Sequence, residues 1–448
     1  MHVPERTSLP HIVVVGAGFG GLTFAQKFPG RLARVTVVDR QNHHLFQPLL
    51  YQVATAGLSA VDIAQPVRAI LRKKRNLEVL LAEVTGFDLG AKKVLLDHGV
   101  ATVAGGTGKG TAGRAELAYD YLLLAAGGLT SYYGHDDWEK VAPGLKTLDD
   151  ALAIRRKVLL SFERAETEPD EQRRRELMTI IVVGGGPTGV ELAGTFAELA
   201  RTVLVRDFDR IDPSKARVLL IEGGDRVLAH YPPDLSASAR RQLERLGVEV
   251  RLGKHVKDVR AGEVQMPDGE IIRGTVIWGA GVVASPLTKQ LGVELDRAGR
   301  VKVLPDLSVP GHPEVFAIGD LVTLTDEKGQ VVPGVAPAAM QMGRHAAKVI
   351  AREIRGDHQS PVGHEPFVYW DKGSLATIGR SSAVAEIGRF HFGGLLAWLA
   401  WLFVHLVFLV GLRNRVAVFS NWVYSYLTYK RGARIITGLH GGGPAGSA

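Results

Sequence analysis

The sequence predicts an α/β fold, because one pattern of strand, glycine turn, helix and strand occurs twice along the chain. An apolar run at residues 11–15 leads directly into the glycine-rich residues 16–21, and a helical pattern and a second apolar run follow before Asp39. The same order returns between Thr179 and Glu222. Such units place their strands side by side in open parallel sheets that bind dinucleotides at the glycine turn. We therefore expect two Rossmann-like dinucleotide-binding domains.

The two copies and the runs between them indicate how the chain is divided. Short apolar runs at residues 275–278 and 315–318 lead into glycines, including Gly281 and Gly319. We expect a discontinuous first domain over residues 9–145 and 280–365, an inserted second domain over 146–279, and a C-terminal region over 366–448. Within these we expect a strand at 117–126, a helix at 190–200, an insertion at 201–216 and a loop at the Gly/Thr-rich residues 104–113.

Composition excludes several kinds of redox chemistry. The 448 residues are 46% hydrophobic and 22% charged, and none is a cysteine. This balance is typical of folded globular protein. The missing cysteines exclude redox disulfides, thiolate–flavin chemistry, iron–sulfur clusters and cysteine zinc sites. The adjacent His43 and His44 lack further clustered ligands, so a turn or packing role is favoured over a metal site. Any electron carrier should therefore be a bound organic cofactor.

The C-terminal end differs from the rest of the chain in charge. The net charge is +8, and no Asp or Glu follows Glu386. The same stretch carries six basic residues: Arg389, Arg413, Arg415, Lys430, Arg431 and Arg434. Because they flank a long apolar run and do not form a polar stripe, anionic lipid is a better partner than nucleic acid.

The apolar run at residues 395–412 allows three interpretations. Its 18 residues contain His405 as the clearly polar one, and this length is at the short limit for a helix that spans a membrane. The amphipathic residues 416–429 that follow suit a helix lying in the membrane interface. A buried helix at a dimer contact is the third interpretation. Residues 1–10 are short and polar without a signal-peptide core, so we expect the bulk of the protein in the cytoplasm.

Each glycine turn has glycines at the positions that a dinucleotide-binding fingerprint requires. The first glycine allows a tight bend, the second lets the backbone approach a pyrophosphate, and the third packs the helix on the strand. The diphosphate then lies at the helix N-terminus, where free N–H groups and the dipole favour anions. These positions are Gly16, Gly18 and Gly21 before Asp39 in the first copy, and Gly184, Gly186 and Gly189 before Glu222 in the second.

The acid after the second fingerprint indicates which nucleotide binds there. A carboxylate such as Glu222 accepts hydrogen bonds from an adenosine ribose and repels a 2′-phosphate. This favours NADH over NADPH, although Arg226 nearby argues the other way. Two dinucleotide sites in one cysteine-free chain indicate one cofactor that stays bound and one that exchanges. FAD and NADH are the pair that fits.

Three single residues have alternative interpretations from local sequence. Glu191, inside the second helix, is either a site residue or an acid in the first turn that complements the helix dipole. Gln341 is either a site residue or an amide on a helix surface. Lys372 is either a site residue or an ordinary surface ammonium.

Several longer motifs are similar to those of one family. The run from His43 to Ala54 reads HHLFQPLLYQVA, and residues 189–194 read GVELAG. Further motifs are WGAG at 278–281, FAIGD at 316–320, DKGS at 371–374 and GLRNR at 411–415. With these motifs in this order, essentially the whole chain resembles the type II NADH:quinone oxidoreductases, which do not pump protons.

The resemblance implies a role for each matching residue. FAD would be held by Gly16, Gly18, Gly20, Gly21, Asp39 and Arg40, with Asp320 at its ribityl–pyrophosphate part and Gly281 and Gly319 alongside. NADH would be held by Gly184, Gly186, Gly189 and Glu222. Glu191 would lie between nicotinamide and flavin, and Gln341 and Lys372 would lie near the quinone. Pro337 replaces the first glutamine of the family's quinone motif, which leaves the quinone contacts and the quinone type open.

The implied reaction is hydride transfer from NADH to FAD, followed by transfer of two electrons to a membrane quinone without proton pumping. The C-terminal amphipathic helices would anchor a monotopic, often homodimeric enzyme on the cytoplasmic face of the bacterial inner membrane. The alternatives are a soluble flavin reductase that delivers electrons to a protein, and a membrane-bound NADH sensor without turnover. Sulfide:quinone reductases share the architecture but work through cysteines, which this chain lacks.

Overall fold

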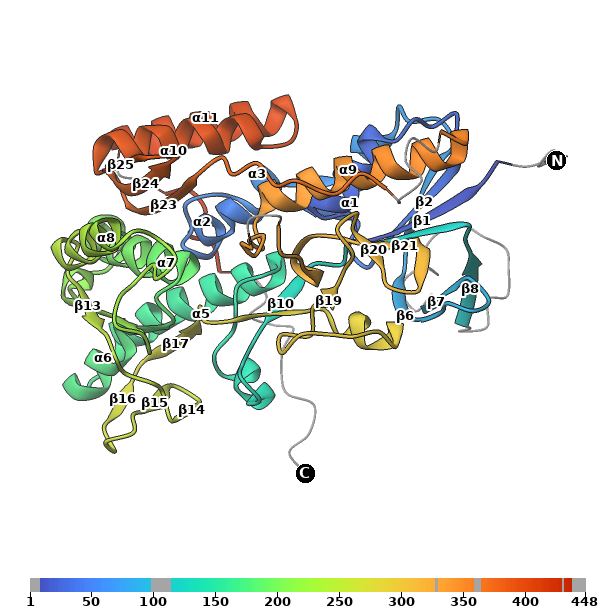
Figure 1. Ribbon diagram of the computed structural model, residues 1–448. Coiled ribbons are helices and arrows are strands. Elements are labelled where there is room, and N and C mark those ends of the chain that lie inside the picture. The colour runs from blue at the N-terminus through green and yellow to red at the C-terminus, as the bar shows by residue number, and fades with distance from the viewer. Residues whose placement is uncertain (1–8, 98–113, 327–328, 358–363, 429–430, 437–448) are drawn as a thin grey trace, which may run out of the picture. The chain divides into compact units, whose positions relative to one another are not determined.

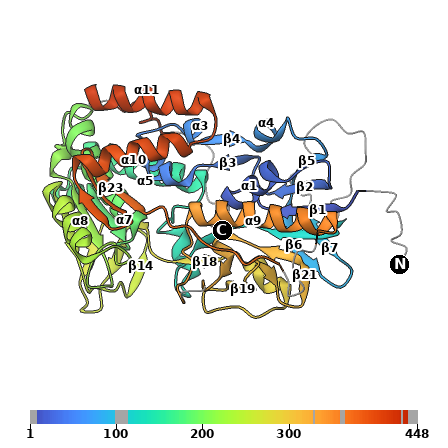
Figure 2. The ribbon, with the colours of Figure 1, turned by 45° about the horizontal axis from the view of Figure 1, so that its top comes forward.

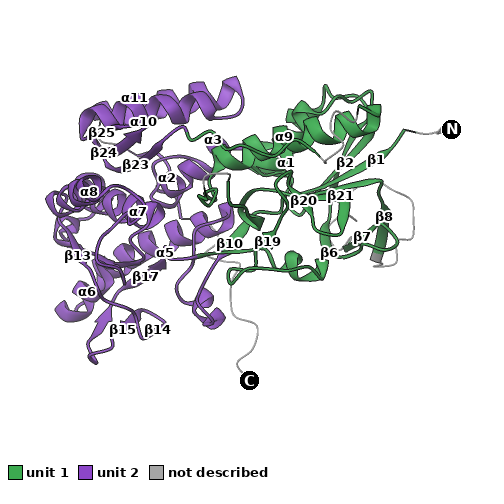
Figure 3. Cartoon of the chain, in the orientation of Figure 1, with its two compact units in different colours: residues 1–44, 65–129, 282–371 green, residues 45–64, 130–281, 372–448 purple. Residues whose placement is uncertain are grey.

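The computed structural model of the chain describes residues 9–97, 114–326, 329–357, 364–428 and 431–436. The chain forms two compact units, each made of three segments (Figure 3). Unit 1 consists of residues 1–44, 65–129 and 282–371, and unit 2 of residues 45–64, 130–281 and 372–448. The domain boundaries expected from the sequence stay a prediction, and the expected loop at 104–113 lies outside the described residues.

Unit 1 is built on a six-stranded sheet in the order β20-β21-β9-β1-β2-β5; β20, β21, β1 and β2 are labelled in Figure 1. These strands are β20 Ser308–Val309, β21 His312–Ala317, β9 Tyr121–Leu124, β1 His11–Val15, β2 Arg34–Asp39 and β5 Leu77–Leu81. All are parallel except β20, which runs antiparallel to β21. β1 is buried along its whole length, as expected for a central parallel strand. The carboxyl ends of β1, β2, β9 and β21 therefore lie at one edge of the sheet.

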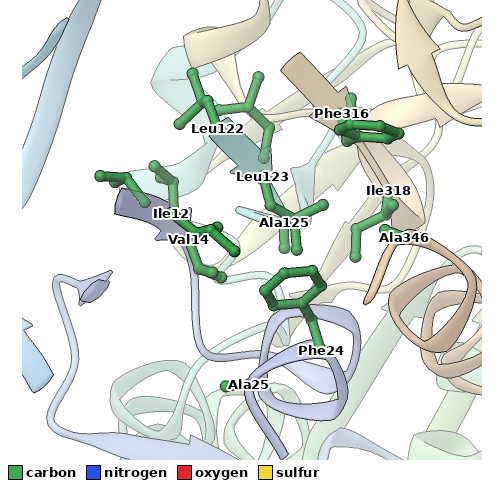
Figure 4. Packing of buried hydrophobic residues seen from close by; sticks show 14 of the residues in the cluster. Ile12, Val14, Phe24, Ala25, Leu122, Leu123, Ala125, Phe316, Ile318 and Ala346 are labelled. Carbon is green, nitrogen blue, oxygen red and sulfur yellow. The ribbon is translucent and has the colours of Figure 1, made fainter. Parts of the chain in front are cut away.

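Helices α1 (Phe19–Lys27) and α9 (Ala336–Arg355) pack against each other in unit 1 (Figure 2). Gly343 makes the close approach possible, because a side chain there would collide with the backbone oxygen of Gly20. Phe24 of α1 is buried and points toward the sheet, where Val14 and Ala125 lie (Figure 4). The face of α9 that packs consists of small or apolar residues at helical spacing: Ala338, Ala339, Met342, Gly343, Ala346, Ala347 and Ile350.

Residues 117–126, expected as one strand, belong to two. β8 (Arg114–Ala118) pairs with β7 (Lys93–Asp97), which pairs with β6 (Glu83–Asp88). β9 begins at Tyr121 in the main sheet, and between the two strands the carboxylate of Asp120 accepts a hydrogen bond from the backbone N–H of His11 at 2.8 Å. The apolar run therefore continues through a change of sheet.

The other elements of unit 1 are short. They are α4 (Val67–Leu71), β18 (Val282–Ala284), β19 (Val301–Lys302), β22 (Val322–Thr323) and the 3-10 turns Pro286–Leu291 and Gly319–Leu321. Three more strands lie where the chain passes from one unit into the other: β3 (His43–Leu45), β4 (Ala64–Pro66) and β10 (Gly128–Thr130).

Unit 2 repeats the parallel design with a four-stranded sheet in the order β13-β12-β11-β17. These strands are β13 Val248–Arg251, β12 Arg217–Ile221, β11 Thr179–Val183 and β17 Thr275–Trp278. Its helices are α5 (Leu148–Thr167), α6 (Glu171–Leu177), α7 (Pro187–Glu198) and α8 (Pro233–Arg245). A small antiparallel sheet contains β14 (Asp258–Arg260), β15 (Glu263–Gln265) and β16 (Ile271–Arg273).

The helix expected at residues 190–200 has different ends in the structure. α7 begins at Pro187, because proline suits a first helical turn, where its missing N–H needs no partner. It ends at Glu198 and continues as a π-helical turn, Leu199–Val203. The expected insertion at 201–216 contains the end of this turn and the 3-10 turns Leu204–Arg206 and Pro213–Lys215.

The C-terminal segment of unit 2 forms a three-stranded antiparallel sheet and two helices. These are β23 (Ser374–Gly379), β24 (Ser382–Ile387), β25 (Phe390–Gly393), α10 (Leu395–Phe408) and α11 (Leu412–Thr428). α10 packs on β24, and α11 packs on α3 (Ala60–Ile63), while α2 (Leu50–Ala54) packs against α5 and α7.

The apolar run at residues 395–412 is not one helix. The chain is extended at Leu409, and Gly411 adopts φ +85°, a conformation that glycine tolerates at little cost. Among the helices of the described residues, none combines the length and the apolar character needed to cross a membrane.

Candidate functional site

The first fingerprint, between β1 and α1, leaves space only at its middle glycine. Gly16 adopts φ +102°, and a side chain there would collide with the backbone of Ala125. A Cβ on Gly21 would overlap the carbonyl oxygen of Gly16, whereas a Cβ on Gly18, the N-cap of α1, would meet no atom within 4 Å. The turn can therefore fold only with glycine at its first and third positions, Gly16 and Gly21. Its middle glycine keeps space open at a helix N-terminus, where backbone N–H groups favour an anion.

Asp39 ends β2 and is bonded to the first fingerprint. Its carboxylate oxygens accept hydrogen bonds from the backbone N–H of Ala17 at 2.6 Å and of Gln41 at 2.7 Å. Burial raises the pKa of the Asp39 carboxyl, while these donors and the neighbouring Arg40 favour the ionised form. Each carboxylate oxygen has a second lone pair, so Asp39 can still accept bonds from a ribose. Arg40 is exposed.

The second fingerprint, between β11 and α7, repeats this geometry in unit 2. Gly184 adopts φ +108°, and a Cβ there would lie 2.7 Å from the backbone nitrogen of Ala280. A Cβ on Gly189 would overlap the carbonyl oxygen of Gly184, whereas a Cβ on Gly186 would meet no atom within 4 Å. Both fingerprints thus contain two glycines that packing requires and one that faces open space.

Glu222 in unit 2 corresponds in position to Asp39 in unit 1. One carboxylate oxygen accepts a hydrogen bond from the N–H of Gly185, directly after the first glycine, and the other accepts one from Gly224 at 2.6 Å. Arg226, which argued for a phosphate, donates to the carbonyl oxygen of Ala229 at 2.9 Å. The carboxylate is therefore held beside the turn, while the guanidinium is engaged within its own loop.

Gly319 and Asp320 follow β21 at the same edge of the unit 1 sheet. Gly319 adopts φ +75°. A Cβ on Gly334, just before α9, would come 3.3 Å from the carboxylate of Asp320. A Cβ on Gly20 would come 2.8 Å from the side chain of Ile318. The fold thus brings the unit 1 residues that the resemblance assigns to FAD to one edge of one sheet.

Gln341 has a defined partner in unit 1. Its Oε1 accepts a hydrogen bond from the N–H of Trp370 at 3.0 Å, and its Nε2 donates to the carbonyl oxygen of the same residue at 2.9 Å. The amide is therefore more than a helix-surface group, since it holds the backbone of Trp370. Pro337 lies in the first turn of α9, where proline is tolerated, so this departure from the family motif is compatible with the helix.

Glu191 is the fifth residue of α7, and the first turn holds no acid, so the interpretation as a first-turn acid is wrong. Its carboxylate accepts a hydrogen bond from the backbone of Thr377 in β23, and burial raises its pKa well above the usual value. Burial raises the pKa values of Tyr51 and Tyr231, and the charge of Glu191 raises them further. A carboxyl in such surroundings keeps its proton at higher pH than a solvated one.

Lys372 and Gly281 both belong to unit 2. The ammonium of Lys372 lies over the ring of Phe408 in α10, 5.5 Å from its centroid, which is within cation–π range. The residue is also exposed, so its role in the site stays a prediction. Gly281 adopts φ +74°, and a Cβ there would lie 2.8 Å from the hydroxyl of Tyr133.

His44 packs within unit 1. It is buried, its Nδ1 lies 3.0 Å from the carbonyl oxygen of Ala17, and its ring meets that of Phe19 edge-on. In the part of the chain that the structure describes, no group of three or more His, Asp or Glu side chains is placed to hold a metal ion.

Tyr51 and Gln52 have no role predicted from the sequence, although both lie in the family-like run from His43 to Ala54. Both side chains are buried. The amide of Gln52 donates to the Tyr51 hydroxyl at 2.9 Å and accepts from the indole N–H of Trp422 in α11 at 2.8 Å. The run itself was the available signal, but a partner 370 residues away cannot be found from it.

A shielded ion pair joins α7 to the end of the chain within unit 2. Nη2 of Arg431 lies 3.2 Å from the carboxylate of Glu198, and the two side chains are 13% and 15% exposed. Arg431 also donates to the carbonyl oxygen of Thr55 at 3.0 Å, and Arg434 pairs with Asp207. These two arginines were expected among the residues that meet lipid, and the structure corrects this, because protein carboxylates engage them.

Helices α10 and α11 each have a buried face and an exposed apolar face. The buried residues are Ala397, Trp398 and Trp401 on α10, and Asn414, Val418 and Trp422 on α11. The exposed ones include Leu396, Leu399, Phe403 and Val407 on α10, and Leu412, Val416, Phe419, Val423 and Leu427 on α11. Exposed apolar surface of this extent indicates contact with a membrane or another protein.

Comparisons with known proteins identify the family of the chain. Residues 10–343 match the pyridine nucleotide-disulphide oxidoreductase family, and residues 371–430 match the NDH2 C-terminal domain. The chain is 44% identical to the type II NADH:quinone oxidoreductase Ndh of Mycobacterium tuberculosis, over 97% of this chain and 92% of that protein. It is also 44% identical to NdhA of the same organism, over 95% and 89%.

The fold of the chain resembles solved structures over nearly its whole length. NDH2 from Plasmodium falciparum in complex with NADH has a TM-score of 0.85 and 22% identity, and the match covers 95% of this chain and 99% of that one. At this identity the likeness concerns the fold alone.

Proposed function

Since the chain belongs to the family of type II NADH:quinone oxidoreductases, we infer that it transfers a hydride from NADH to bound FAD and two electrons onward to a membrane quinone, without pumping protons. The observation that carries this inference is the pair of fingerprints, each with an open middle glycine and a fixed acid, in a chain without cysteine. The cofactors supply the redox chemistry, so the protein contributes position and electrostatics.

We propose that the unit 1 fingerprint holds FAD. The space at Gly18 lets a pyrophosphate reach the N–H groups at the start of α1. Asp39 is held by two backbone donors and accepts bonds from the adenosine ribose, with Arg40 at the rim. Asp320, near the start of α9, faces the ribityl–pyrophosphate part. These residues fit the cofactor because the structure leaves room where a diphosphate needs backbone and places carboxylates where hydroxyls need acceptors.

We propose that the unit 2 fingerprint holds NADH. The space at Gly186 takes the pyrophosphate at the start of α7. The carboxylate of Glu222 is fixed by two backbone N–H groups, so it cannot easily turn away from a 2′-phosphate. Repulsion between these like charges supports a preference for NADH over NADPH.

We propose that the carboxyl of Glu191 stays protonated near the nicotinamide. Its raised pKa supports this, because a neutral carboxyl can donate a hydrogen bond or a proton. Glu191→Gln should slow turnover while the flavin content stays normal. Unchanged turnover in this variant would remove the assignment.

We propose separate roles in quinone reduction for Gln341 in unit 1 and for Lys372 in unit 2. Gln341 acts through Trp370, whose backbone it holds and whose side chain is 70% exposed. The positive charge of Lys372 stabilises negative charge that develops on a quinone oxygen. Gln341→Leu should therefore raise the KM for quinone, and Lys372→Met should mainly lower kcat.

The enzyme is a peripheral membrane protein, and its exposed helix faces support attachment by α10 and α11. We propose that these faces lie in the interface of the cytoplasmic leaflet of the bacterial inner membrane and that the enzyme works there as a homodimer. Among the described residues, Arg389, Arg413 and Arg415 are exposed basic residues near these helices and suit contact with anionic lipid.

The first test is NADH oxidation by purified, FAD-loaded protein with and without a soluble short-chain quinone, with NADPH alongside. Rapid quinone-dependent turnover that prefers NADH is the expected result. Flavin that NADH reduces but no quinone reoxidises would refute the acceptor assignment and direct attention to Pro337. Equal rates with NADPH would refute the role of Glu222.

A further inference from the structure

The second residue of each glycine fingerprint is held by hydrogen bonds at both of its backbone groups. In unit 1 this residue is Ala17, whose N–H donates to the carboxylate of Asp39 at 2.6 Å. Its carbonyl oxygen lies 3.0 Å from Nδ1 of His44. A carboxylate therefore fixes one side of this residue, and an imidazole fixes the other.

Unit 2 holds the equivalent residue, Gly185, in the same way. Its N–H donates to the carboxylate of Glu222, and its carbonyl oxygen accepts a hydrogen bond from the backbone N–H of Leu228 at 2.7 Å. In both units the donor to the carbonyl oxygen comes shortly after the acid in the sequence, His44 after Asp39 and Leu228 after Glu222. Two fingerprints of different sequence thus share one arrangement of hydrogen bonds.

The bond to the carbonyl oxygen determines where the next N–H points. The carbonyl group of Ala17 and the N–H of Gly18 belong to one planar peptide group, and in a trans peptide group these two bonds point in opposite directions. Because His44 holds the carbonyl oxygen on one side, the N–H of Gly18 is directed to the other. It lies at the start of α1, where N–H groups have no partner within the helix and where Gly18 leaves open space.

The imidazole of His44 must be the donor in this bond. A carbonyl oxygen can only accept, so Nδ1 carries a hydrogen. Burial lowers the pKa of His44, which favours the neutral ring with its one hydrogen on Nδ1. Nε2 is buried and has no hydrogen-bond partner among the described residues. The bond to the carbonyl oxygen therefore has no competing bond at the other ring nitrogen.

Packing fixes the orientation of this donor. The side chain of His44 is 3% exposed. Its ring meets that of Phe19 edge-on, with the ring centroids 5.1 Å apart. Phe19 is the first residue of α1, so the same imidazole contacts both the glycine turn and the helix that follows it.

We propose that His44 is a positioning residue for FAD: its Nδ1–H holds the carbonyl oxygen of Ala17 and thereby directs the N–H of Gly18 toward the pyrophosphate. In unit 2 the backbone N–H of Leu228 has the corresponding role for NADH, so that site needs no side chain for it. This inference rests on the proposed binding of FAD at the unit 1 fingerprint.

The proposal predicts how fast FAD leaves two variants of His44. His44→Leu fills similar space without a donor, which frees the peptide group between Ala17 and Gly18 to rotate. FAD should then be released about 3- to 10-fold faster, as expected for the loss of one hydrogen bond between neutral groups. His44→Asn places an amide N–H near the position of Nδ1 and should release FAD at nearly the wild-type rate. A role limited to packing predicts the opposite order, because asparagine is smaller than histidine and leaves a cavity.

His43→Leu is the matched control. His43 is adjacent to His44, but its Nδ1 lies 3.0 Å from the side-chain oxygen of Asn42, and the residue is only partly buried. The substitution therefore removes an imidazole from the same strand, β3, and leaves the bond to Ala17 in place. FAD release from this variant should stay at the wild-type rate.

The measurement is the rate at which FAD fluorescence appears after full-length holoenzyme is diluted into a fixed concentration of potassium bromide, which promotes release. The KM for NADH is measured alongside with a short-chain quinone. The expected result is faster release from His44→Leu, but not from His44→Asn or His43→Leu. The KM for NADH should not change, because the unit 2 fingerprint has its own donor.

The proposal is overturned by an unchanged release rate in His44→Leu, by equally fast release from His44→Asn, or by an equal effect in His43→Leu. A rise in the KM for NADH as large as the change in FAD release would also overturn it, since this would indicate general loosening of the fold. If His44→Leu does not fold, His44→Gln must give the same faster release, because its amide reaches past the position of Nδ1.

The outcomes separate this inference from the proposed function. Wild-type protein without FAD, or FAD whose retention does not respond to Gly18→Ala, would refute the binding of FAD at the unit 1 fingerprint. Wild-type protein that holds FAD and loses it in Gly18→Ala, with a release rate indifferent to His44→Leu, would refute this inference alone.

Discussion

Changing Gly186 to alanine should weaken NADH binding without releasing FAD, and changing Gly18 to alanine should do the reverse. Both glycines have negative φ angles, −70° and −67°, which alanine adopts without strain. A Cβ at either position would meet no protein atom within 4 Å. Both variants should therefore fold normally, and any change should concern the ligand that occupies the space.

The size of the effect follows from what the added methyl group displaces. It occupies the space at the helix N-terminus where a pyrophosphate must approach backbone N–H groups. Loss of one hydrogen bond to a charged group costs about 1.5–3 kcal/mol, and 1.4 kcal/mol corresponds to about a factor of ten. We expect the KM for NADH in Gly186→Ala to rise roughly 10- to 100-fold, and Gly18→Ala to be purified with much of its FAD missing.

The assay is a NADH titration at saturating short-chain quinone, together with the flavin content measured by visible absorbance after gel filtration. Gly189→Ala is the contrasting variant, because its Cβ would overlap a carbonyl oxygen. Overpacking of this kind costs about 1–3 kcal/mol of stability, so that variant should lose thermal stability. Loss of FAD with an unchanged KM for NADH in Gly186→Ala would reverse the assignment of the two fingerprints. Unchanged binding of both FAD and NADH would refute the inference that a pyrophosphate occupies the space beside Gly18 and Gly186.

Three further predictions concern unit 2. Arg431→Met removes the arginine that is paired with the shielded carboxylate of Glu198, which keeps its bond from the backbone N–H of Arg380. Breaking a buried pair costs about 3–5 kcal/mol, so the melting temperature should fall in a thermal scan; an unchanged value would show that the pair contributes nothing. Because burial raises the pKa of Glu191 above 4.5, the folded state binds a proton that the unfolded chain releases, and stability falls as pH rises between the two pKa values. The melting temperature of Glu191→Gln should therefore exceed that of the wild type by a margin that grows from acid to neutral pH, and a constant margin would contradict the raised pKa. Replacing Phe403 and Phe419, which are 68% and 54% exposed, by serine removes about 1.5–3 kcal/mol of membrane burial each and should release the enzyme from liposomes in a flotation assay. Ile271→Ser is the control, since this exposed side chain lies on β16, and equal release by it would argue against the helices as anchor.

The strand–turn–helix units could be predicted because their signals are local. A buried strand, a glycine that needs positive φ and a carboxylate at the next strand end all lie within one short stretch. The structure confirms the expected strands β1, β2, β11, β12 and β17 with nearly the expected ends. The expected bounds of two elements were wrong for the same reason. Residues 117–126 change sheet at Asp120, and the apolar run at 395–412 breaks near Gly411, where tertiary contacts and one backbone angle override a continuous apolar pattern.

The same distinction between local and tertiary signals applies to the residues of the site. The glycines and acids of both fingerprints could be named from spacing, because their chemistry requires those residue types in that order. The surroundings of single side chains could not. The amide of Gln341 is paired with the backbone of Trp370, and Arg431, expected to meet lipid, pairs with Glu198. Each partner is set by how helices and loops pack, and no local pattern encodes it.

The sequence by itself determined the α/β class, the two dinucleotide fingerprints, the exclusion of thiol and iron–sulfur chemistry, and the family. Only the tertiary structure decided that Gly18 and Gly186 face open space while their neighbours are packed, and that burial raises the pKa of Glu191. It alone also joined Trp422 of α11 to Tyr51 of α2 through Gln52. The physical reason is range: backbone angles and periodicity depend on neighbours along the chain, whereas burial, hydrogen-bond partners and pKa values depend on neighbours in space.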